Sequence, residues 1–284
     1  MEHFEPLEQN IQLNKQTNLE IDLLLEAIYR LSGYDFRQYN RSSISRRIFN
    51  RMRINSIPTI SRVQEKVIHD QEFLEQLLND FSINVTEMFR NPSFFKAFRE
   101  TVIPALRDYQ EIRIWHAGCA TGEEVYSMAI LLQEEGLIDK AVIYATDMNE
   151  QVLEKAKKGV FPIHKMQAYT KNYMLAGGAH AFSEYYKTDY QYAYFHPTLL
   201  KNIIFAQHNL VTDQSFNEFH VVLCRNVLIY FSPQLQSQVH HLFYESLSDN
   251  GFLCLGDKET LRFEEVISNY REVVGNERIY QKIE

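Results

Sequence analysis

The chain has 284 residues, of which 45% are apolar, so its length allows one or two domains with a buried core and excludes a disordered chain. The longest apolar runs, such as residues 227–231, fall far short of the roughly 18 residues that a membrane span requires, and the first residues lack the pattern of a signal peptide. The net charge of −8 argues against a general nucleic-acid binder. We therefore expect a cytoplasmic protein that neither binds nucleic acid nor inserts into a membrane.

The first hundred residues predict helices only. Apolar side chains recur at helical spacing from residue 19 to residue 31, and Gly33 follows where a C-terminal cap belongs. Pro92 suits the first turn of a later helix. The predicted helices are residues 19–31, 43–54, 61–69, 72–81 and 92–107.

The second of these helices is rich in arginine, and no acid occurs between residues 36 and 53. Ile44, Ile48 and Met52 form an apolar stripe, so the arginines of this helix cannot all lie on that stripe. A concentrated positive surface fits an anionic partner. The alternative is a solvated helix face whose charges are compensated by acids nearby in space. The arginines are Arg37, Arg41, Arg46, Arg47, Arg51 and Arg53.

From residue 111 the pattern changes to short apolar strands that alternate with helices. Such alternation is typical of an α/β fold with a parallel sheet covered on both faces. Residues 161–197 lack a helical period and are rich in tyrosine, so we expect a small insertion of helices and antiparallel strands there. The predicted strands are residues 112–118, 141–146, 202–206, 219–224, 252–255 and 278–282, and the predicted helices are residues 123–135, 150–157 and 233–247.

Three polar features follow predicted strands, where sheets of this kind bind their ligands. Gly118 and Gly122 lie in the turn after the first strand, Asp147 follows the second, and Arg225 and Asn226 follow the fourth. Glycines allow a tight turn and a close approach to a ligand. An aspartate at a strand end can accept hydrogen bonds from both hydroxyls of a ribose. Each feature alone also fits an ordinary turn or a helix cap.

The turn after the first strand lacks the G-x-G-x-x-G pattern of dinucleotide-binding loops. Glu123 and Glu124 follow it directly and would repel a pyrophosphate. S-adenosylmethionine carries a ribose diol, a sulfonium and an ammonium, and no phosphate. The two acids therefore favour a methyltransferase over an NAD-dependent oxidoreductase.

Cysteine and histidine usage predicts neither a disulfide framework nor a metal site. Cys119, Cys224 and Cys254 are widely spaced, and the ten histidines are scattered without a ligand pattern. We expect three free thiols in a reducing compartment.

Five stretches of the chain resemble the chemotaxis receptor glutamate methyltransferases of the CheR type. They read SINVTEMFR at residues 82–90, IWHAGCATGEEVYSMA at 114–129, YATDMNEQVLEKAKKGVF at 144–161, HNL at 208–210 and LCRNVLIYF at 223–231. Their order and spacing extend the resemblance from the N-terminal helices to the C-terminus.

The resemblance implies a fold and an activity. It implies an all-helical, receptor-docking domain at residues 1–90 and a Rossmann-like class I methyltransferase domain at residues 91–284, with a small antiparallel β subdomain inserted at residues 160–200. The implied activity is transfer of the methyl group of S-adenosylmethionine to glutamate side chains of chemoreceptors. S-adenosylhomocysteine is the implied product, and no metal is expected.

The resemblance also implies roles for individual residues. Arg90 and Tyr230 are the expected catalytic residues, near the incoming glutamate. Glu124 is expected to face the methionine and adenosine, and Asp147 to hold the ribose. The implied cofactor-binding residues are Asn84, Thr86, Arg90, Glu124, Asp147, Asn209, Leu210, Arg225 and Asn226.

The chemistry agrees with these roles. A glutamate side chain, with a pKa near 4.3, is ionised at neutral pH, so in-line methyl transfer from a sulfonium needs no general base. Arginine offers a planar fork to a carboxylate, and tyrosine adds one donor. The alternatives are a salt bridge between domains for Arg90 and a core aromatic for Tyr230, whose neighbours in sequence are apolar.

The chain departs from the family pattern at three places. Val125 stands where a proline is common, Asn149 replaces the second acid of a D-x-D motif, and residues 256–259 read GDKE where GHSE is frequent. Because Asp147 is retained, we expect cofactor binding. The altered loop bears on the shape of the substrate side.

The expected partners are methyl-accepting chemoreceptors, whose methylation segments are long helices that bear glutamates. The residues expected to dock them are Arg46, Arg47, Arg51 and Arg53 of the basic helix. The β insertion is a second candidate contact, and we expect a monomer. Two other classes stay open: a non-catalytic scaffold that keeps the fold, against which the intact site residues argue, and an NAD-dependent oxidoreductase.

Overall fold

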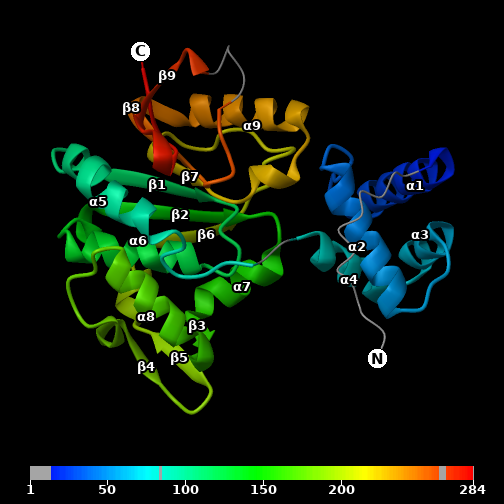
Figure 1. Cartoon of the computed structure of the whole chain (residues 1–284), viewed down its shortest axis with the longest axis horizontal. Coiled ribbons are helices and arrows are strands. Elements are labelled where there is room, and N and C mark those ends of the chain that lie inside the picture. The colour runs from blue at the N-terminus through cyan, green and yellow to red at the C-terminus, as the bar shows by residue number, and fades with distance from the viewer. Residues whose placement is uncertain (1–13, 83–84, 262–266, 284) are drawn as a thin grey trace, which may run out of the picture. The chain divides into compact units, whose positions relative to one another are not determined.

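The computed structural model describes residues 14–82, 85–261 and 267–283 (Figure 1). The chain divides into two compact units, Met1–Ser82 and Ile83–Glu284. None of the helices in these described ranges is long and apolar enough to cross a membrane.

In its described part the first unit is all-helical, as predicted. Each helix begins at a side chain that accepts a backbone N–H bond, which satisfies one of the free donors of the first turn. Gly33 ends the first helix in the left-handed conformation that its position predicts. The helices are α1 (Lys15–Ser32), α2 (Arg41–Ile54), α3 (Ile60–His69) and α4 (Gln71–Phe81).

The apolar faces of these helices form the core of the first unit. Ile21 and Ile28 of α1 and Ile48 of α2 are fully buried. Phe36, between α1 and α2, packs edge-on against Phe81 of α4 with ring centroids 5.0 Å apart. The unit thus has a hydrophobic core of its own.

Two of the four arginines that we expected to dock a partner are held inside the first unit, which corrects that expectation. Arg51 forms an ion pair with Asp80 of α4, with Nε 2.6 Å from Oδ2, and its side chain is only 12% exposed. Arg47 donates to the Asp80 carbonyl oxygen at 2.7 Å. Arg46 and Arg53 are exposed.

Two further arginines also have acidic partners nearby. Arg37 forms ion pairs with Asp35 and Glu26, and Arg41 forms one with Asp22 of α1. The alternative of a compensated basic face therefore describes much of this segment, and only part of its charge is available to a partner.

A seven-stranded sheet with the order β6-β2-β1-β7-β8-β10-β9 organises the second unit (Figure 1). Its first five strands run parallel, whereas the last two are antiparallel to their neighbours. The sheet is therefore mixed, and not wholly parallel as the sequence predicts. The strands are β1 (Ile112–Ala117), β2 (Ala141–Asp147), β6 (Ile203–Gln207), β7 (Phe219–Cys224), β8 (Leu247–Leu255), β9 (Tyr270–Val274) and β10 (Ile279–Lys282).

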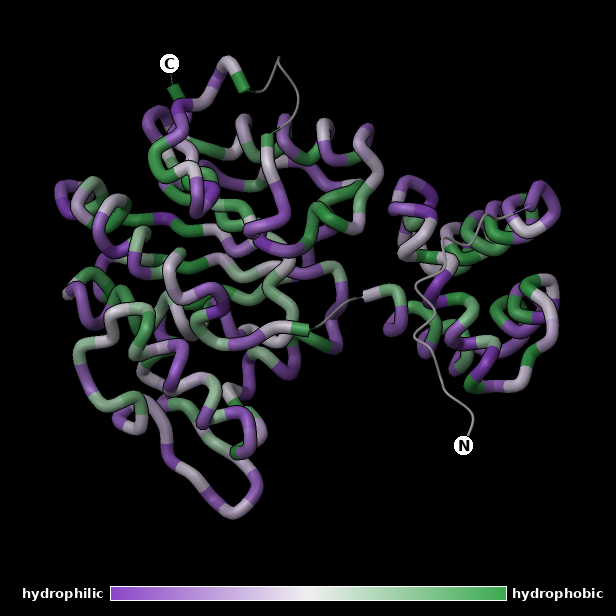
Figure 2. Tube along the Cα trace, viewed as in Figure 1, coloured by the Kyte–Doolittle hydropathy of each residue, from purple (hydrophilic) through white to green (hydrophobic). Residues whose placement is uncertain are grey.

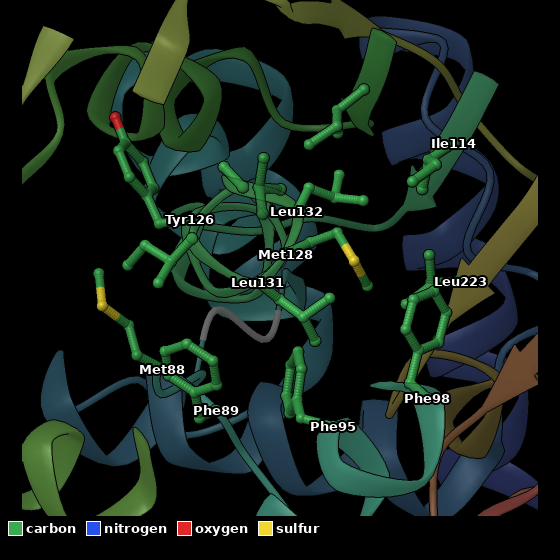
Figure 3. Packing of buried hydrophobic residues seen from close by; sticks show 14 of the residues in the cluster. Met88, Phe89, Phe95, Phe98, Ile114, Tyr126, Met128, Leu131, Leu132 and Leu223 are labelled. Carbon is green, nitrogen blue, oxygen red and sulfur yellow. The ribbon is translucent and has the colours of Figure 1, made fainter. Parts of the chain in front are cut away.

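Helices cover both faces of the sheet. α5 (Pro92–Leu106), α6 (Glu123–Glu134) and α7 (Glu150–Lys158) pack with the inward side chains of one face, where Figure 3 shows Leu131 of α6 beside Phe95 of α5. On the opposite face α9 (Pro233–Ser246) places Phe243 against Trp115 of β1, with ring centroids 5.6 Å apart. Figure 2 shows the resulting concentration of hydrophobic residues along the central strands.

The insertion after α7 consists of a helix and a small sheet of order β3-β5-β4. Glu134, at the end of α6, anchors it: Tyr173 and Tyr185 of the insertion donate to the Glu134 carboxylate, the latter at 2.7 Å, and Arg99 of α5 pairs with the other oxygen at 2.7 Å. The elements are β3 (Val160–Pro162), α8 (Met166–Leu175), β4 (Tyr186–Thr188) and β5 (Tyr192–Phe195).

The division between the units lies at residues 82 and 83, earlier than the predicted boundary after residue 90. Met88 and Phe89 are fully buried in the core of the second unit, and the Phe89 N–H donates to Oγ of Ser127 in α6 at 2.8 Å. Because these contacts fasten the segment before α5 to α6, Arg90 belongs to the second unit.

Candidate active site

Four neighbouring parallel strands, β6, β2, β1 and β7, have their C-terminal ends on the same side of the sheet. The chain leaves β1 toward β2 and β6 and then returns to β7 on the other side of β1, so the strand order reverses between β1 and β7. Ligands of such sheets bind at this switch point. The loops with the predicted glycines, Asp147, Asn209 and Arg225 all follow these strands.

The loop after β1 requires glycine at two positions. Gly118 has a φ of 78° and Gly122 a φ of 91°, both in the left-handed region. A Cβ on Gly118 would lie 2.6 Å from Cγ2 of Val227, and one on Gly122 would lie 2.9 Å from Cβ of Ala156. The loop therefore lies close to the segment after β7 and to α7. A side chain at Gly118 would push against the first, and one at Gly122 would push against the second.

Asp147 joins the loop after β1 to the loop after β2. Its Oδ2 accepts the N–H of Ala120 at 2.9 Å, and its Oδ1 accepts the N–H of Asn149 at 3.0 Å. Burial raises the pKa of the Asp147 carboxyl, and these backbone N–H bonds act in the opposite direction. Each carboxylate oxygen can accept a further hydrogen bond, so the residue can still hold a diol.

Glu124, in the first turn of α6, lies between two partners. Its Oε2 is 2.8 Å from Nη1 of Arg225, and its Oε1 is 3.1 Å from Nδ1 of His116 on β1. Burial would raise the pKa of the Glu124 carboxyl, but Arg225 and His116 outweigh that effect and lower its pKa to about 2. The carboxylate is therefore ionised at every physiological pH.

Arg225 extends this network to the start of α5. Its guanidinium donates to the Arg90 carbonyl oxygen at 3.3 Å and to Oδ1 of Asn91 at 3.1 Å, and it stacks over the Phe94 ring at 3.9 Å. Its side chain is only 2% exposed. Arg225 thus holds the segment that carries Arg90 against Glu124.

The two acids after the glycine loop are less available than the sequence indicates. Glu123 is turned toward the insertion, where it accepts the Tyr169 hydroxyl at 3.2 Å and lies 3.5 Å from Nζ of Lys165. Glu124 is paired with Arg225. The two carboxylates are therefore largely neutralised by partners within the protein, and their charge alone is weak evidence for a cationic ligand.

Most of these elements line one pocket. Arg90 is half-buried at the pocket, and its Nη1 makes a long contact of 3.4 Å with the Val85 carbonyl oxygen. Asn84 lies outside the described residues, so its predicted role has no structural test. The lining residues include Thr86, Arg90, Gly118, Ala120, Glu124 and Asn226.

Four predicted residues, Asp147, Asn209, Leu210 and Tyr230, are not among those that line this pocket. Asp147 contacts the pocket loop through the Ala120 N–H. Asn209 and Leu210 are half-buried in the loop after β6, and Oδ1 of Asn209 accepts the Val211 N–H at 3.0 Å. Tyr230 is half-buried in a short 3-10 turn after β7. Their roles remain predictions.

Two residues that the sequence reasoning missed support the site. His116 contacts Glu124, and Glu259 is a buried carboxylate whose Oε2 accepts the N–H groups of Asn226 at 2.8 Å and Gly256 at 2.7 Å. Burial raises the pKa of the Glu259 carboxyl, and the backbone N–H bonds oppose that shift. The sequence could have indicated His116, because residues 112, 114 and 116 of a strand point to the same face and Ile112 and Ile114 are buried. A polar residue at that position needs a partner.

Metal-ligating side chains do not gather here. Across the described ranges, no three or more His, Cys, Asp or Glu residues are grouped so that they could hold a metal ion. Burial raises the pKa of the Cys119 thiol at the glycine loop well above its usual value, and the carboxylate of Asp147 adds to that shift. Cys119 is therefore a protonated packing residue, not a nucleophile.

Comparison with known proteins decides the family. Residues 84–274 match the family described as CheR methyltransferase, SAM binding domain, and residues 19–82 match its all-alpha domain. The chain belongs to the CheR methyltransferase family. It is 47% identical to the protein named Cher3 of Pseudomonas putida over 94% of this chain and 98% of that protein. The chemotaxis protein methyltransferase of Listeria monocytogenes is 30% identical over 86% of this chain and 92% of its own, and that of Escherichia coli is 26% identical over 82% of each.

The family confirms the main predictions from sequence. This CheR protein has the predicted all-helical domain, Rossmann-like methyltransferase fold and antiparallel insertion, and it is an S-adenosylmethionine-dependent methyltransferase. The alternative of an NAD-dependent oxidoreductase is wrong.

The donor set at the sheet edge fits S-adenosylmethionine. Asp147 retains acceptor positions that suit a ribose diol, and the glycine loop brings the backbone close to the pocket. Thr86 supplies a hydroxyl at the pocket, and Arg90 supplies a guanidinium, which suits a carboxylate.

Proposed function

We propose that this CheR protein methylates glutamate side chains of chemoreceptors. The observation that carries the proposal is the pocket at the switch point of a CheR-family domain, with Arg90 at its lining and the ionised Glu124 held by Arg225. When bound, S-adenosylmethionine supplies an electrophilic methyl group. S-adenosylhomocysteine keeps the ribose diol, so it binds the same residues and inhibits.

Arg90 and Tyr230 are the proposed catalytic residues. The substrate carboxylate arrives ionised and needs no base, so the task of the protein is to orient it and to exclude water. The Arg90 guanidinium offers a fork to the carboxylate. Its contact with the Val85 carbonyl oxygen is long, at 3.4 Å. The Tyr230 hydroxyl is the proposed second donor.

The proposed cofactor contacts divide by chemistry. Asp147 accepts the ribose hydroxyls, and Glu124 faces the methionine and adenosine side. Thr86 and Arg90 line the pocket from the segment before α5, and Asn84, outside the described residues, is proposed as a further cofactor contact. Asn209, Leu210 and Asn226 contribute from the loops after β6 and β7, and Arg225 acts through Glu124 because its own side chain is almost fully buried.

The proposed receptor surface is smaller than the arginine content of α2 suggests. Arg46 and Arg53 are exposed, and they can approach the acidic methylation helices of a receptor. Arg47 and Arg51 stabilise the first unit through α4. The insertion is a second proposed contact, and the protein is proposed to act as a cytoplasmic monomer without a metal.

Incubation with labelled S-adenosylmethionine and receptor-bearing membranes tests the proposal. We expect transfer of label to the receptor, and we expect mild base to release it, because carboxyl methyl esters hydrolyse readily. Cofactor binding without transfer would support the non-catalytic scaffold instead. Base-stable label would indicate methylation of another side chain.

A further inference from the structure

His116 is a buried polar residue that no part of the proposed mechanism uses. It lies on β1, its side chain is 1% exposed, and it pairs in the sheet with Ala145 of β2 and Leu223 of β7. A histidine at such a position usually costs stability unless it is hydrogen-bonded. Its Nδ1 is 3.1 Å from Oε1 of Glu124.

The protonation of Glu124 fixes the direction of this bond. With its pKa lowered to about 2 by Arg225 and His116 against the effect of burial, the Glu124 carboxylate is ionised and can only accept hydrogen bonds. The proton therefore lies on Nδ1 of His116, which donates to Oε1. Nε2 of His116 is buried and has no hydrogen-bond partner in the described part of the chain.

The two oxygens of Glu124 are held by different elements of the fold. His116 holds Oε1 from β1, and Arg225 holds Oε2 from the end of β7. Arg225 also binds the Arg90 carbonyl oxygen. A carboxylate with a donor on each oxygen cannot rotate about its terminal bond without losing one of them, so its remaining acceptor positions keep a constant direction.

We propose that His116 is a positioning residue, which fixes the rotation of the Glu124 carboxylate and thereby sets the affinity for S-adenosylmethionine. The inference rests on the proposed cofactor role of Glu124. Without the Nδ1 donor, Glu124 would be held by Arg225 alone and would have to be ordered when the cofactor binds. Removing this donor is expected to raise the dissociation constant for S-adenosylmethionine and to leave the turnover rate at saturating cofactor unchanged.

Three substitutions separate this role from simple core packing. His116→Leu keeps the volume and removes the donor, whereas His116→Asn places an amide N–H close to the position of Nδ1. His116→Gln places its amide near the position of Nε2 instead and serves as a polar control. Thermal unfolding of each variant identifies any that fails to fold, and the Asn and Gln variants then form a matched pair without His116→Leu.

The measurement is the dissociation constant for S-adenosylmethionine by calorimetry, in the absence of receptor. We expect His116→Leu and His116→Gln to raise it by about five- to tenfold and His116→Asn to keep it within about twofold of the wild type. In a Glu124→Gln background, His116→Leu should add almost nothing, because the two residues act through one contact.

Equal affinity of the Leu and Asn variants would overturn the inference and assign His116 to core packing. An unchanged affinity of Glu124→Gln alone would overturn it together with the cofactor role of Glu124. Failure of the proposed function is distinguishable, because it would abolish transfer to receptors and leave this pattern of affinities intact.

Discussion

Asp147 has two tasks at one carboxylate. It accepts backbone N–H groups from the loops after β1 and β2, and it is the proposed ligand of the ribose. Asp147→Ala removes both, so we expect S-adenosylmethionine binding to weaken by roughly 1.5 to 3 kcal/mol, measured by calorimetry. Asp147→Asn keeps one acceptor oxygen and should lose less. An unchanged affinity in Asp147→Ala would mean that the ribose is held elsewhere.

Tyr230 separates binding from chemistry. Tyr230→Phe removes one hydroxyl and little volume, so the affinity for S-adenosylmethionine and the melting temperature should stay nearly unchanged. If the hydroxyl orients the substrate carboxylate, the turnover of receptor methylation should fall. Wild-type turnover in a steady-state assay would instead assign Tyr230 to packing.

Glu124 makes folding stability depend on pH in a defined window. Its pKa lies near 2 in the folded protein, because Arg225 and His116 outweigh burial, against an ordinary value of 4.5. Its contribution is therefore fully present above about pH 4.5 and is lost as the pH falls toward 2, with a total on the order of 3 kcal/mol. Urea unfolding should show a steeper loss of stability over this window in the wild type than in Glu124→Gln. Parallel pH profiles would contradict the assigned ion pair.

At the scale of elements, Glu134 joins α5, α6 and the insertion through one buried carboxylate. Its side chain is 1% exposed and is bonded to Arg99, Tyr173 and Tyr185. Glu134→Ala leaves these partners buried without it, so we expect a loss of about 3 kcal/mol in the free energy of unfolding. Hydrogen exchange should accelerate first in α8.

An exposed ion pair provides the matched control for Glu134. Glu154 on α7 pairs with Lys157, and both side chains are about half exposed. Glu154→Ala should leave the free energy of unfolding nearly unchanged, because an exposed ion pair is screened by solvent. Equal losses in the two variants would contradict an anchoring role of Glu134.

The sequence predicts those elements whose pattern of apolar residues matches the faces that are buried in the structure. Strands β1, β2 and β7 are mostly apolar because both of their faces are covered, although Arg113 and His116 interrupt β1 and His220 interrupts β7. Helices α1 to α5 show one apolar stripe each. β9 is not predicted, because Arg271 and Glu272 interrupt its apolar pattern at the edge of the sheet. The antiparallel direction of β10 depends on pairing with β8, which no local pattern encodes.

The site residues divide in the same way. Gly118, Gly122 and Asp147 are visible in the sequence because they follow strands, where a turn or a ligand needs them. The links of Glu124 to His116 and Arg225 are not visible, since they join residues 8 and 101 positions apart. Side-chain direction also decides that Glu123 faces the insertion, and sequence spacing does not reveal it.

For the whole molecule, the proposed role of α2 is to dock the receptor, and substitutions in this basic helix test that role. Replacing the exposed Arg46 and Arg53 with Ala should raise the apparent KM for receptor and flatten its dependence on salt, because such steering is screened within about 8 Å at physiological ionic strength. The affinity for S-adenosylmethionine should stay unchanged.

The control for this pair lies on the same helix. Arg47 and Arg51 bind α4, so the double Ala variant should lower the stability of the first unit and leave receptor kinetics near those of the wild type under conditions where the unit is folded. If both double variants change the KM for receptor alike, or if neither changes it, the proposal that α2 docks the receptor is wrong.

We propose that this CheR-family protein forms methyl esters on receptor glutamates with the pocket at the C-terminal ends of β1 and β7. Mass spectrometry of a receptor fragment, after incubation with the protein and isotope-labelled S-adenosylmethionine, tests it directly. We predict labelled methyl groups on glutamate side chains, removable by mild base and strongly reduced with Asp147→Ala. Label on lysine, arginine or another side chain, or no label on a receptor while the protein binds the cofactor, would contradict the claim.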